Sequence, residues 1–223
     1  MSLIKFPFSL LAEWTCLLAS ILLLRNVIPK YWKLFIPYLA LTVAVESYSF
    51  IANRVLLIKV DTQWMYNLFL LIYLLFHLYI FSKIIELRFI RNIGIAGLLF
   101  LLVSYSLEWG QKGFFNFFST TNILFSGIVI VLCIIYFYSL FQQEDYKNIF
   151  KDAAFWFVTG CLIFYAATVG LFAFFSKIAA PDQTNLVILR KIIISILNII
   201  MYGCWIKSFL CLRRARASLR QSS

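Results

Sequence analysis

Apolar residues dominate seven separate stretches of the chain, and polar residues gather between them. The stretches cover residues 8–25, 34–53, 64–82, 92–107, 120–141, 153–175 and 189–212. A helix of about 20 apolar residues spans the roughly 30 Å hydrocarbon core of a bilayer. The pattern therefore predicts an all-α, polytopic transmembrane bundle of seven helices. Strands of a membrane barrel would alternate with period two, whereas the apolar runs here are continuous.

The fourth stretch gives the weakest helical signal. Its sequence, NIGIAGLLFLLVSYSL, is short and has two glycines near its start. The segment that follows, EWGQKGFFNFF, is expected to form an interfacial loop, with Trp109 and several Phe in the headgroup region. The other connections are short, so each helix should pack against its neighbours in sequence. Residues 1–223 are expected to form a single domain.

The overall composition agrees with a protein that has the bilayer as its solvent. Hydrophobic residues make up 63% of the 223 residues, charged residues only 13%, and the mean hydropathy is +0.92. Soluble domains are about 45–50% apolar and about 25% charged. A chain of this length cannot bury so much Phe, Leu and Ile in a water-soluble core. The composition excludes a soluble domain.

The basic residues predict the orientation of the bundle. With the N-terminus outside, segments 25–33, 83–91, 147–151 and the tail from Lys207 face the cytoplasm and carry 13 Lys and Arg, against 7 on the outer side. The positive-inside rule then favours an outer N-terminus and a cytoplasmic C-terminus. Attraction to anionic headgroups accounts for the net charge of +11. Membrane lipids are the predicted partners, and nucleic acid is not one.

A glutamate stands inside the second apolar stretch, in the sequence LTVAVESYSFIAN. Thr42, Glu46, Ser49 and Asn53 fall on one face of the predicted helix. An acidic side chain at bilayer depth costs about 2.5–3.5 kcal/mol. No Lys or Arg lies at the depth of Glu46 in any stretch, so we expect a neutral acid that is hydrogen-bonded to Asn and Tyr side chains.

Polar side chains of the other stretches fall at a similar depth, in the outer half of the bundle. The simpler interpretation of these polar side chains is helix packing, because Ser, Thr and Asn often join membrane helices through hydrogen bonds worth about 0.6 kcal/mol. The acids favour a second interpretation, an outward-facing polar cavity that binds a small ligand or lipid and is floored by Tyr73 and Tyr202. The residues predicted to line it are Glu13, Glu46, Tyr66, Asn67, Tyr73, Asn122, Tyr165, Asn198 and Tyr202.

Catalytic and metal-binding patterns are sparse in the sequence. His77 is the only histidine, which is too few for the usual zinc ligand set, and we interpret it as structural. There is no GxSxG, phosphate-binding glycine loop or HExxH motif. The last stretch lacks the central lysine of a retinal protein, since Lys191 and Lys207 stand near its ends. We therefore expect no cofactor and no metal, and an enzymatic activity is disfavoured.

Small residues are expected to serve packing. The five cysteines lie within or beside the apolar stretches and form no CxxC pair, so we interpret them as small apolar residues. Gly160 and Gly170 in the sixth stretch are expected to let a neighbouring helix approach closely.

Three segments carry a resemblance to a known family. WMYNLFLLIYLLF, DAAFWFVTGCLIFYAATVGLF and ILNIIMYGCWIKSFLC together resemble a family of small, uncharacterised seven-helix bacterial membrane proteins. The positions that match the family are Glu46, the pair Tyr66 and Asn67, the pair Phe155 and Trp156 with Gly160, and Asn198. Tyr73 stands where members often carry an acid. Genes of this family often lie near sensor histidine kinases, which implies a bacterial inner-membrane location and a place in signalling.

Two functions remain open from the sequence. One is a receptor-like or accessory membrane protein whose cavity binds a small ligand, with a membrane or cytoplasmic signalling protein as partner. The other is a small-molecule or proton-coupled transporter that uses Glu46 as its titrating group. Transporters often contain internal repeats and helices broken near the midplane. Here Pro37 lies early in its stretch and no repeat is evident, so the receptor-like function is favoured. An integral membrane enzyme ranks third.

Overall fold

The described part of the chain is entirely helical. The computed structural model describes residues 8–25, 27, 29–52, 62–85, 90–142, 148–178 and 184–221. They contain no strand and seven α-helices: α1 (Phe8–Leu24), α2 (Phe35–Phe50), α3 (Gln63–Ile84), α4 (Ile90–Lys112), α5 (Ser119–Phe141), α6 (Ala153–Ile178) and α7 (Thr184–Gln221). Short 3-10 helices, η1 (Lys30–Leu34) and η3 (Ile149–Lys151), precede α2 and α6. The prediction of an all-α, seven-helix bundle is confirmed.

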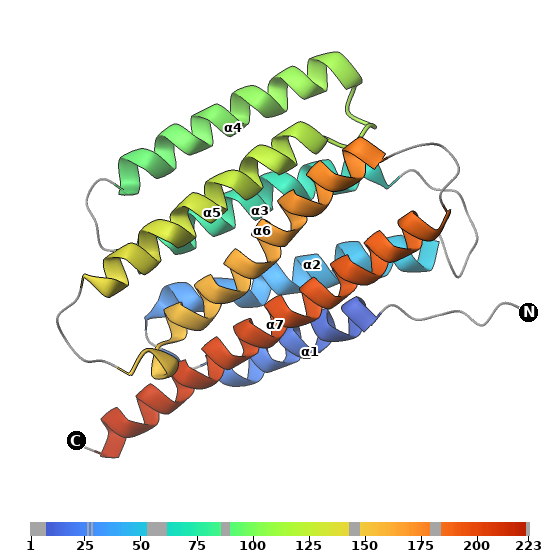
Figure 1. The fold of residues 1–223 in the computed structure, drawn as a ribbon. Helices are drawn as coiled ribbons and strands as arrows, with labels where there is room; N and C mark the ends of the chain where they lie inside the picture. The colour runs from blue at the N-terminus through green and yellow to red at the C-terminus, as the bar shows by residue number, and fades with distance from the viewer. Residues whose placement is uncertain are drawn as a thin grey trace, which may run out of the picture.

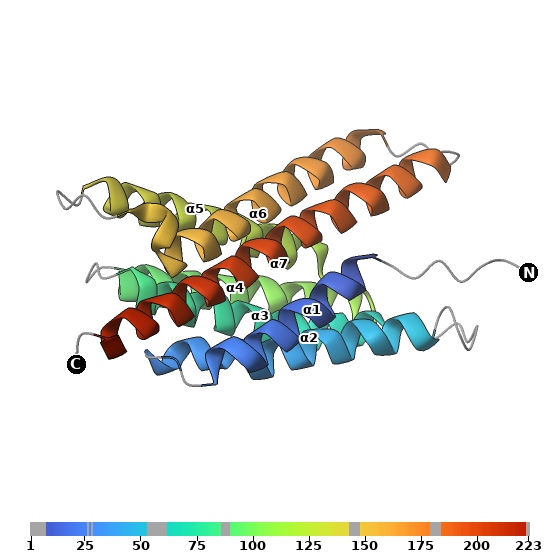
Figure 2. The same ribbon diagram turned by 90° about the horizontal axis from the view of Figure 1, so that it is seen from below.

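The helices run up and down along one common direction. α1 begins at one end of the bundle and α7 finishes at the other (Figures 1 and 2). α7 packs along both α6 and α1, so the last helix closes the bundle against the first. α5 packs on α6, and α4 lies on the outside, where its principal contacts are with α3 and α5. Consecutive helices are thus neighbours, as the short connections predict.

Five of the described helices are long and apolar enough to cross a membrane. The qualifying segments are Gln63–Ile84, Asn92–Lys112, Ser119–Phe141, Ala153–Phe172 and Ile188–Ser218, and α1 is a shorter apolar helix of 17 residues. Large apolar side chains stand on their outer faces, for example Leu22 on α1 and Val103 on α4, which are 76% and 58% exposed. Such surfaces are suited to hydrocarbon rather than water. The fold is that of an integral membrane protein.

Two helices are longer than their apolar stretches predict. α4 extends to Lys112 instead of ending near residue 107, so EWGQK forms its last turns and the connecting loop is only 113–118. α7 runs on through the arginine-rich tail to Gln221. Hydropathy marks where a helix leaves the apolar layer, whereas helical hydrogen bonding continues through polar residues and here also through Gly110. Helix length was therefore underestimated at both places.

Some positions used in the sequence predictions lie outside the described residues. Asn53, the last member of the polar face that contains Glu46, is one of them. The same holds for Arg54, Lys59, Arg88 and Lys147, which enter the orientation argument. The orientation of the termini stays a prediction.

Aromatic side chains fill the centre of the bundle. Phe35 is fully buried, and its ring lies 4.9 to 5.4 Å from five other aromatic rings, mostly edge to face. Such edge-on pairs are favourable beyond the area they bury. We call this cluster the aromatic core; its members are Trp32, Phe35, Tyr38, Phe76, His77, Phe125, Phe157, Trp205 and Phe209.

His77 is a member of the aromatic core, and both ring nitrogens have partners. Nδ1 lies 2.9 Å from the Tyr73 carbonyl oxygen, and Nε2 lies 3.2 Å from the Tyr165 hydroxyl. A carbonyl oxygen only accepts, so Nδ1 carries the hydrogen and donates to Tyr73. Nε2 of the neutral ring then accepts a hydrogen bond from the Tyr165 hydroxyl. These contacts agree with the structural role expected for the single histidine.

A close approach of two helices occurs at Gly160. A Cβ atom added there would lie 2.8 Å from Cys204 Cβ and 3.2 Å from the Met201 carbonyl oxygen. Glycine is therefore required for α6 and α7 to pack at this distance, as predicted. The same prediction is wrong for Gly170, around which a Cβ would meet nothing within 4 Å.

Candidate functional site

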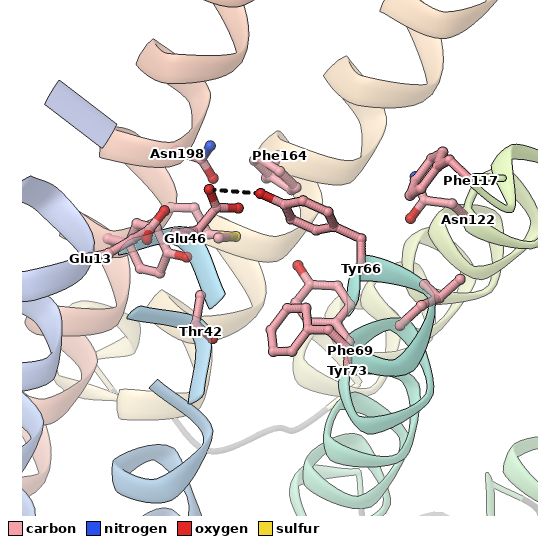
Figure 3. Close-up of a pocket in the computed structure, with 13 residues that line it drawn as sticks. Glu13, Thr42, Glu46, Tyr66, Phe69, Tyr73, Phe117, Asn122, Phe164 and Asn198 are labelled. Carbon is pink, nitrogen blue, oxygen red and sulfur yellow. Dashed lines mark hydrogen bonds between the residues drawn. The ribbon is translucent and has the colours of Figure 1, made fainter. Parts of the chain in front are cut away.

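A cavity of about 200 Å³ lies between six of the helices, in the half of the bundle where α1 begins. Figure 3 shows side chains from α1, α2 and α7 on one side of it and side chains from α3 and the start of α5 on the other. It is lined by Glu13, Thr42, Glu46, Tyr66, Phe69, Leu70, Tyr73, Phe117, Asn122, Phe164, Asn198, Met201 and Tyr202.

Most residues predicted to line a cavity surround this one. Of the nine residues named from the sequence, seven are in its wall: Glu13, Glu46, Tyr66, Tyr73, Asn122, Asn198 and Tyr202. They come from five helices that are far apart in sequence. Polar residues that share a depth in the sequence prediction thus lie around one cavity in the fold. Their role in binding stays a prediction.

Glu46 is half-buried near the end of α2, and a tyrosine from the next helix contacts it. The Tyr66 hydroxyl donates a hydrogen bond to Glu46 Oε2 at 3.2 Å (Figure 3). Tyr66 stands in the first turn of α3, directly beside the last turn of α2. This contact provides the tyrosine partner expected for the acid.

Glu13 has a different environment. Its side chain points inward from α1 and is only 5% exposed, on the same face as Cys16, Leu17 and Ser20. Its Oε2 atom is buried and has no hydrogen-bond partner. Almost all buried polar atoms in proteins are paired, so an unpaired carboxylate oxygen at a cavity wall is unusual. The carboxyl groups of Glu13 and Glu46 also interact electrostatically.

Neither acid of the cavity has a basic neighbour among the described residues. Among the described residues an ion pair joins Lys112 to Glu108, and neither of these two residues lines the cavity. The cavity wall contains no Lys, Arg or His. The wall combines two carboxyl groups with hydroxyl and amide groups, and none of its side chains carries a positive charge.

Aromatic rings make up much of the remaining wall. They belong to Tyr66, Phe69, Tyr73, Phe117, Phe164 and Tyr202. Two of them form the floor: the Tyr73 ring centroid lies 4.5 Å from that of His77, and the Tyr202 ring centroid lies 5.5 Å from that of Trp205. The cavity therefore lies directly on the aromatic core through these two tyrosines.

Two of the predicted site residues do not line the cavity. Tyr165 is fully buried one layer below, where its hydroxyl contacts His77 Nε2 at 3.2 Å. Asn67 is also fully buried, but its amide faces the loop between α4 and α5. Helical spacing places polar residues on a common face, but it does not distinguish a side chain that faces a cavity from one that faces a neighbouring segment.

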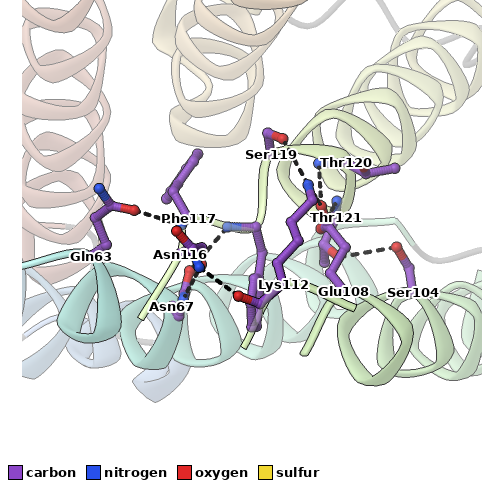
Figure 4. Close-up of polar contacts among 11 residues, drawn as sticks. Gln63, Asn67, Ser104, Glu108, Lys112, Asn116, Phe117, Ser119, Thr120 and Thr121 are labelled. Carbon is purple, nitrogen blue, oxygen red and sulfur yellow. Dashed lines mark hydrogen bonds and ion pairs between the residues drawn. The ribbon is translucent and has the colours of Figure 1, made fainter. Parts of the chain in front are cut away.

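Asn67 holds the 113–118 loop against α3. Its Nδ2 donates to the carbonyl oxygens of Phe114 and Asn116 at 2.8 and 2.9 Å, and its Oδ1 accepts from the Phe118 backbone N–H at 3.1 Å (Figure 4). Gln63 accepts from the Phe117 N–H at 2.8 Å. These bonds position Phe117 at the edge of the cavity, so Asn67 positions the wall rather than forming part of it.

Glu108 is a structural acid that the sequence analysis placed in a loop. It is 4% exposed, pairs with Lys112 at 2.6 Å, and accepts backbone N–H bonds from Thr120 and Thr121 at 3.1 and 2.8 Å (Figure 4). The first N–H groups of a helix need acceptors, and Phe118 at the start of α5 offers none from its side chain. Glu108 of α4 thus caps α5 from outside that helix.

The cavity wall supplies carboxyl, hydroxyl, amide and aromatic groups. No group of three or more His, Cys, Asp or Glu side chains able to hold a metal lies among the described residues. The histidine is held below the floor by two hydrogen bonds and does not line the cavity. Sequence analysis missed the apolar lining, such as Phe164 and Met201, because apolar residues in a membrane helix carry no signal of their own. Comparisons of the chain with protein-family models, curated proteins and solved structures give no match.

Proposed function

We propose that this chain is a receptor-like or accessory integral membrane protein whose polar cavity binds a small ligand or lipid. It acts together with a separate signalling protein and resides in the bacterial inner membrane. The cavity faces outward, because it lies in the half of the bundle where α1 begins and the basic residues favour an outer N-terminus. The proposal concerns ligand capture, without turnover of the ligand.

The unpaired Oε2 of Glu13 carries the proposal. Leaving a buried polar group without a partner costs about 1–3 kcal/mol, and more for a charged group. A molecule that enters the cavity and pairs with this atom removes that cost. Ionisable residues inside membrane proteins are by default functional for this reason.

The floor of the cavity favours a receptor over a transporter. Transport requires a path that opens alternately to both sides of the membrane. Below Tyr73 and Tyr202 the aromatic core fills the bundle, and Phe35, Phe125, Phe157 and Trp205 in it are all 0% exposed. A ligand held above this layer has no route through it without repacking. A proton-coupled transporter that uses Glu46 remains the alternative and is distinguished by measuring flux.

The opposite end of the bundle offers a surface for a partner. α7 extends beyond Ser208, its last fully buried polar residue, and carries the exposed residues Arg213 and Arg214. A basic helical extension beside the membrane attracts anionic headgroups and acidic protein surfaces. We propose that the signalling partner contacts this segment, while ligand capture takes place at the other end.

A filled-cavity variant tests the proposal. Asn198 lines the cavity, whereas the adjacent Ile199 is exposed on the outer face of α7. We expect some members of a chemically diverse small-molecule library to raise the thermal unfolding temperature of the purified protein. Asn198→Phe should abolish these shifts, and Ile199→Phe, which introduces the same residue next to it, should preserve them.

Flux measurements separate the two functions. In proteoliposomes, a compound that stabilises the protein should show no accumulation above empty liposomes at any pH gradient. Uptake that vanishes in Glu46→Gln would establish the transporter instead. Shifts that survive in Asn198→Phe would show that ligands bind elsewhere, and the proposed function would be wrong.

A further inference from the structure

We propose that the ligand is a small organic cation, such as an alkylamine or a quaternary ammonium compound. This inference rests on the proposed function and specifies the chemistry of the same cavity. The positive charge of the ligand lies at the carboxyl groups of Glu13 and Glu46, and the carbon atoms of the ligand contact the surrounding aromatic rings. Three independent features of the cavity support it: its charge, its aromatic wall and its size.

The charge of the cavity wall is one-sided. Glu13 and Glu46 both line it, and no lining residue is basic. The Glu13 side chain is 95% buried, and its Oε2 atom lacks any hydrogen-bond donor. An alkylammonium donates a hydrogen bond to this atom and favours the ionised form of the acid, and a quaternary ammonium favours the ionised form through its charge alone. A carboxylate or phosphate ligand disfavours that form and binds less well.

The aromatic wall fits an organic cation. Six of the thirteen lining residues are Phe or Tyr, and the negative face of an aromatic ring attracts an ammonium group. Such an interaction is worth about 0.5–1 kcal/mol at exposed sites and about 2 kcal/mol when water is excluded. Quaternary ammonium ligands are bound in this way by cages of aromatic rings. The aromatic residues also bury the alkyl part of the ligand.

The size of the cavity argues against a bare metal ion. Its volume of about 200 Å³ is several times the roughly 30 Å³ that one water molecule occupies in the liquid. A bare metal ion would leave most of this space to solvent. Hard cations also require six or more oxygen ligands at about 2.0–2.6 Å. The space matches a molecule with several carbon atoms.

The hydroxyl and amide groups supply orientation rather than charge. Tyr66 already donates to Glu46 Oε2, and Figure 3 shows Asn198 on the same side of the cavity as both acids. The Asn198 side chain therefore lies where it contacts the charged end of a ligand. Phe69 and Tyr73 of α3 lie toward the opposite wall (Figure 3) and contact its apolar end.

Matched pairs of probes test the charge of the ligand. Full-length protein in detergent is titrated with methylammonium, tetramethylammonium, butylammonium and choline. Choline is compared with 3,3-dimethylbutan-1-ol, its neutral carbon isostere, and with 3,3-dimethylbutanoate, at constant ionic strength. We expect at least one cation to raise the unfolding temperature saturably. The neutral isostere of choline should bind at least tenfold more weakly than choline, and the anion should cause no shift.

Matched variants locate the binding site. Glu13→Gln and Glu46→Gln each preserve side-chain size and should weaken cation affinity at least tenfold. Asp152→Asn is the control, because Asp152 caps α6 at the other end of the bundle and does not line the cavity. It loses one negative charge, like the test variants, and should leave cation affinity unchanged. Each variant is referred to its own ligand-free unfolding temperature, so any loss of stability is accounted for.

The outcomes separate this inference from the proposed function. If every cation fails, or if neutral isostere and cation bind equally, the ligand is not an organic cation. Sodium chloride that reproduces the shift at equal concentration would overturn the inference in favour of an inorganic ion. In each of these cases, a library compound whose effect is lost in Asn198→Phe would still support the cavity as a receptor site.

Discussion

Tyr66 donates a hydrogen bond to Glu46 at 3.2 Å and thereby joins the first turn of α3 to the second half of α2 at the wall of the cavity. The two residues are 20 positions apart in sequence. The bond therefore connects an intramembrane acid to the neighbouring helix. Glu13, the second acid, has no such partner at its Oε2 atom.

The first prediction concerns the hydroxyl of Tyr66. Tyr66→Phe removes the donor to Glu46 and retains the ring, so the free energy of unfolding should fall by about 0.6 kcal/mol and by no more than about 1.7 kcal/mol. Thermal or denaturant unfolding in detergent measures the change. Tyr79→Phe on the exposed face of the same helix is the control and should be neutral. Equal stability of both variants would show that the bond contributes nothing.

The second prediction concerns the loop between α4 and α5. Asn67→Leu leaves the two loop carbonyls and the Phe118 N–H without their partner, and it should destabilise the protein by about 1–3 kcal/mol. Gln63→Leu removes the bond to the Phe117 N–H from an exposed residue and should cost less. Hydrogen exchange of residues 113–118 should accelerate more in the Asn67 variant. The reverse order would contradict the central role of Asn67.

The third prediction separates the two roles of Glu108. Glu108→Ala removes the cap of α5, which should cost about 0.5–2 kcal/mol. Lys112→Ala leaves the cap in place and removes the ion pair together with the 3.4 Å contact of Lys112 Nζ with Ser119 Oγ. Both lie at a partly exposed lysine and should contribute less than about 1 kcal/mol. Chemical unfolding of the two variants provides the comparison. Equal losses would mean that the ion pair, rather than the cap, is the stabilising contact.

The fourth prediction concerns the approach of α6 to α7. Gly160→Ala places a Cβ 2.8 Å from Cys204 Cβ, and overpacking of this kind typically costs about 1–3 kcal/mol. Gly170→Ala, in the same helix but with open space around it, should be neutral or slightly stabilising because Ala favours helix over Gly. Thermal unfolding distinguishes them. A tolerated Gly160→Ala would show that the two helices can separate without loss.

Much of the fold follows from hydropathy. Apolar runs of bilayer length predict the helices, and the short connections predict which helices are neighbours. The ends of α4 and α7 do not follow, because Glu108 and the tail arginines are polar but helical. At the end of α4, Glu108 accepts backbone N–H bonds from the start of α5, a contact between two helices that hydropathy does not predict.

The candidate site is predictable only in part, for a geometric reason. Polar residues in membrane helices are rare. Their depth and helix face in the sequence place Glu13, Glu46 and Asn198 near one another, and all three line the same cavity in the fold. The same reasoning includes Asn67, whose rotation about the α3 axis directs it to the loop instead. Apolar lining residues such as Phe164 cannot be recognised among the many Phe of the chain. The rotation and packing of the helices determine which apolar side chains line the cavity.

A high-resolution map of the protein with a stabilising compound bound is the most direct test of the ligand cavity. We expect density for that molecule within hydrogen-bonding distance of Glu13 Oε2 and beside Glu46 and Asn198. A map in which side chains close this space, or in which the Glu46 carboxyl turns toward the surrounding lipid, would contradict the account.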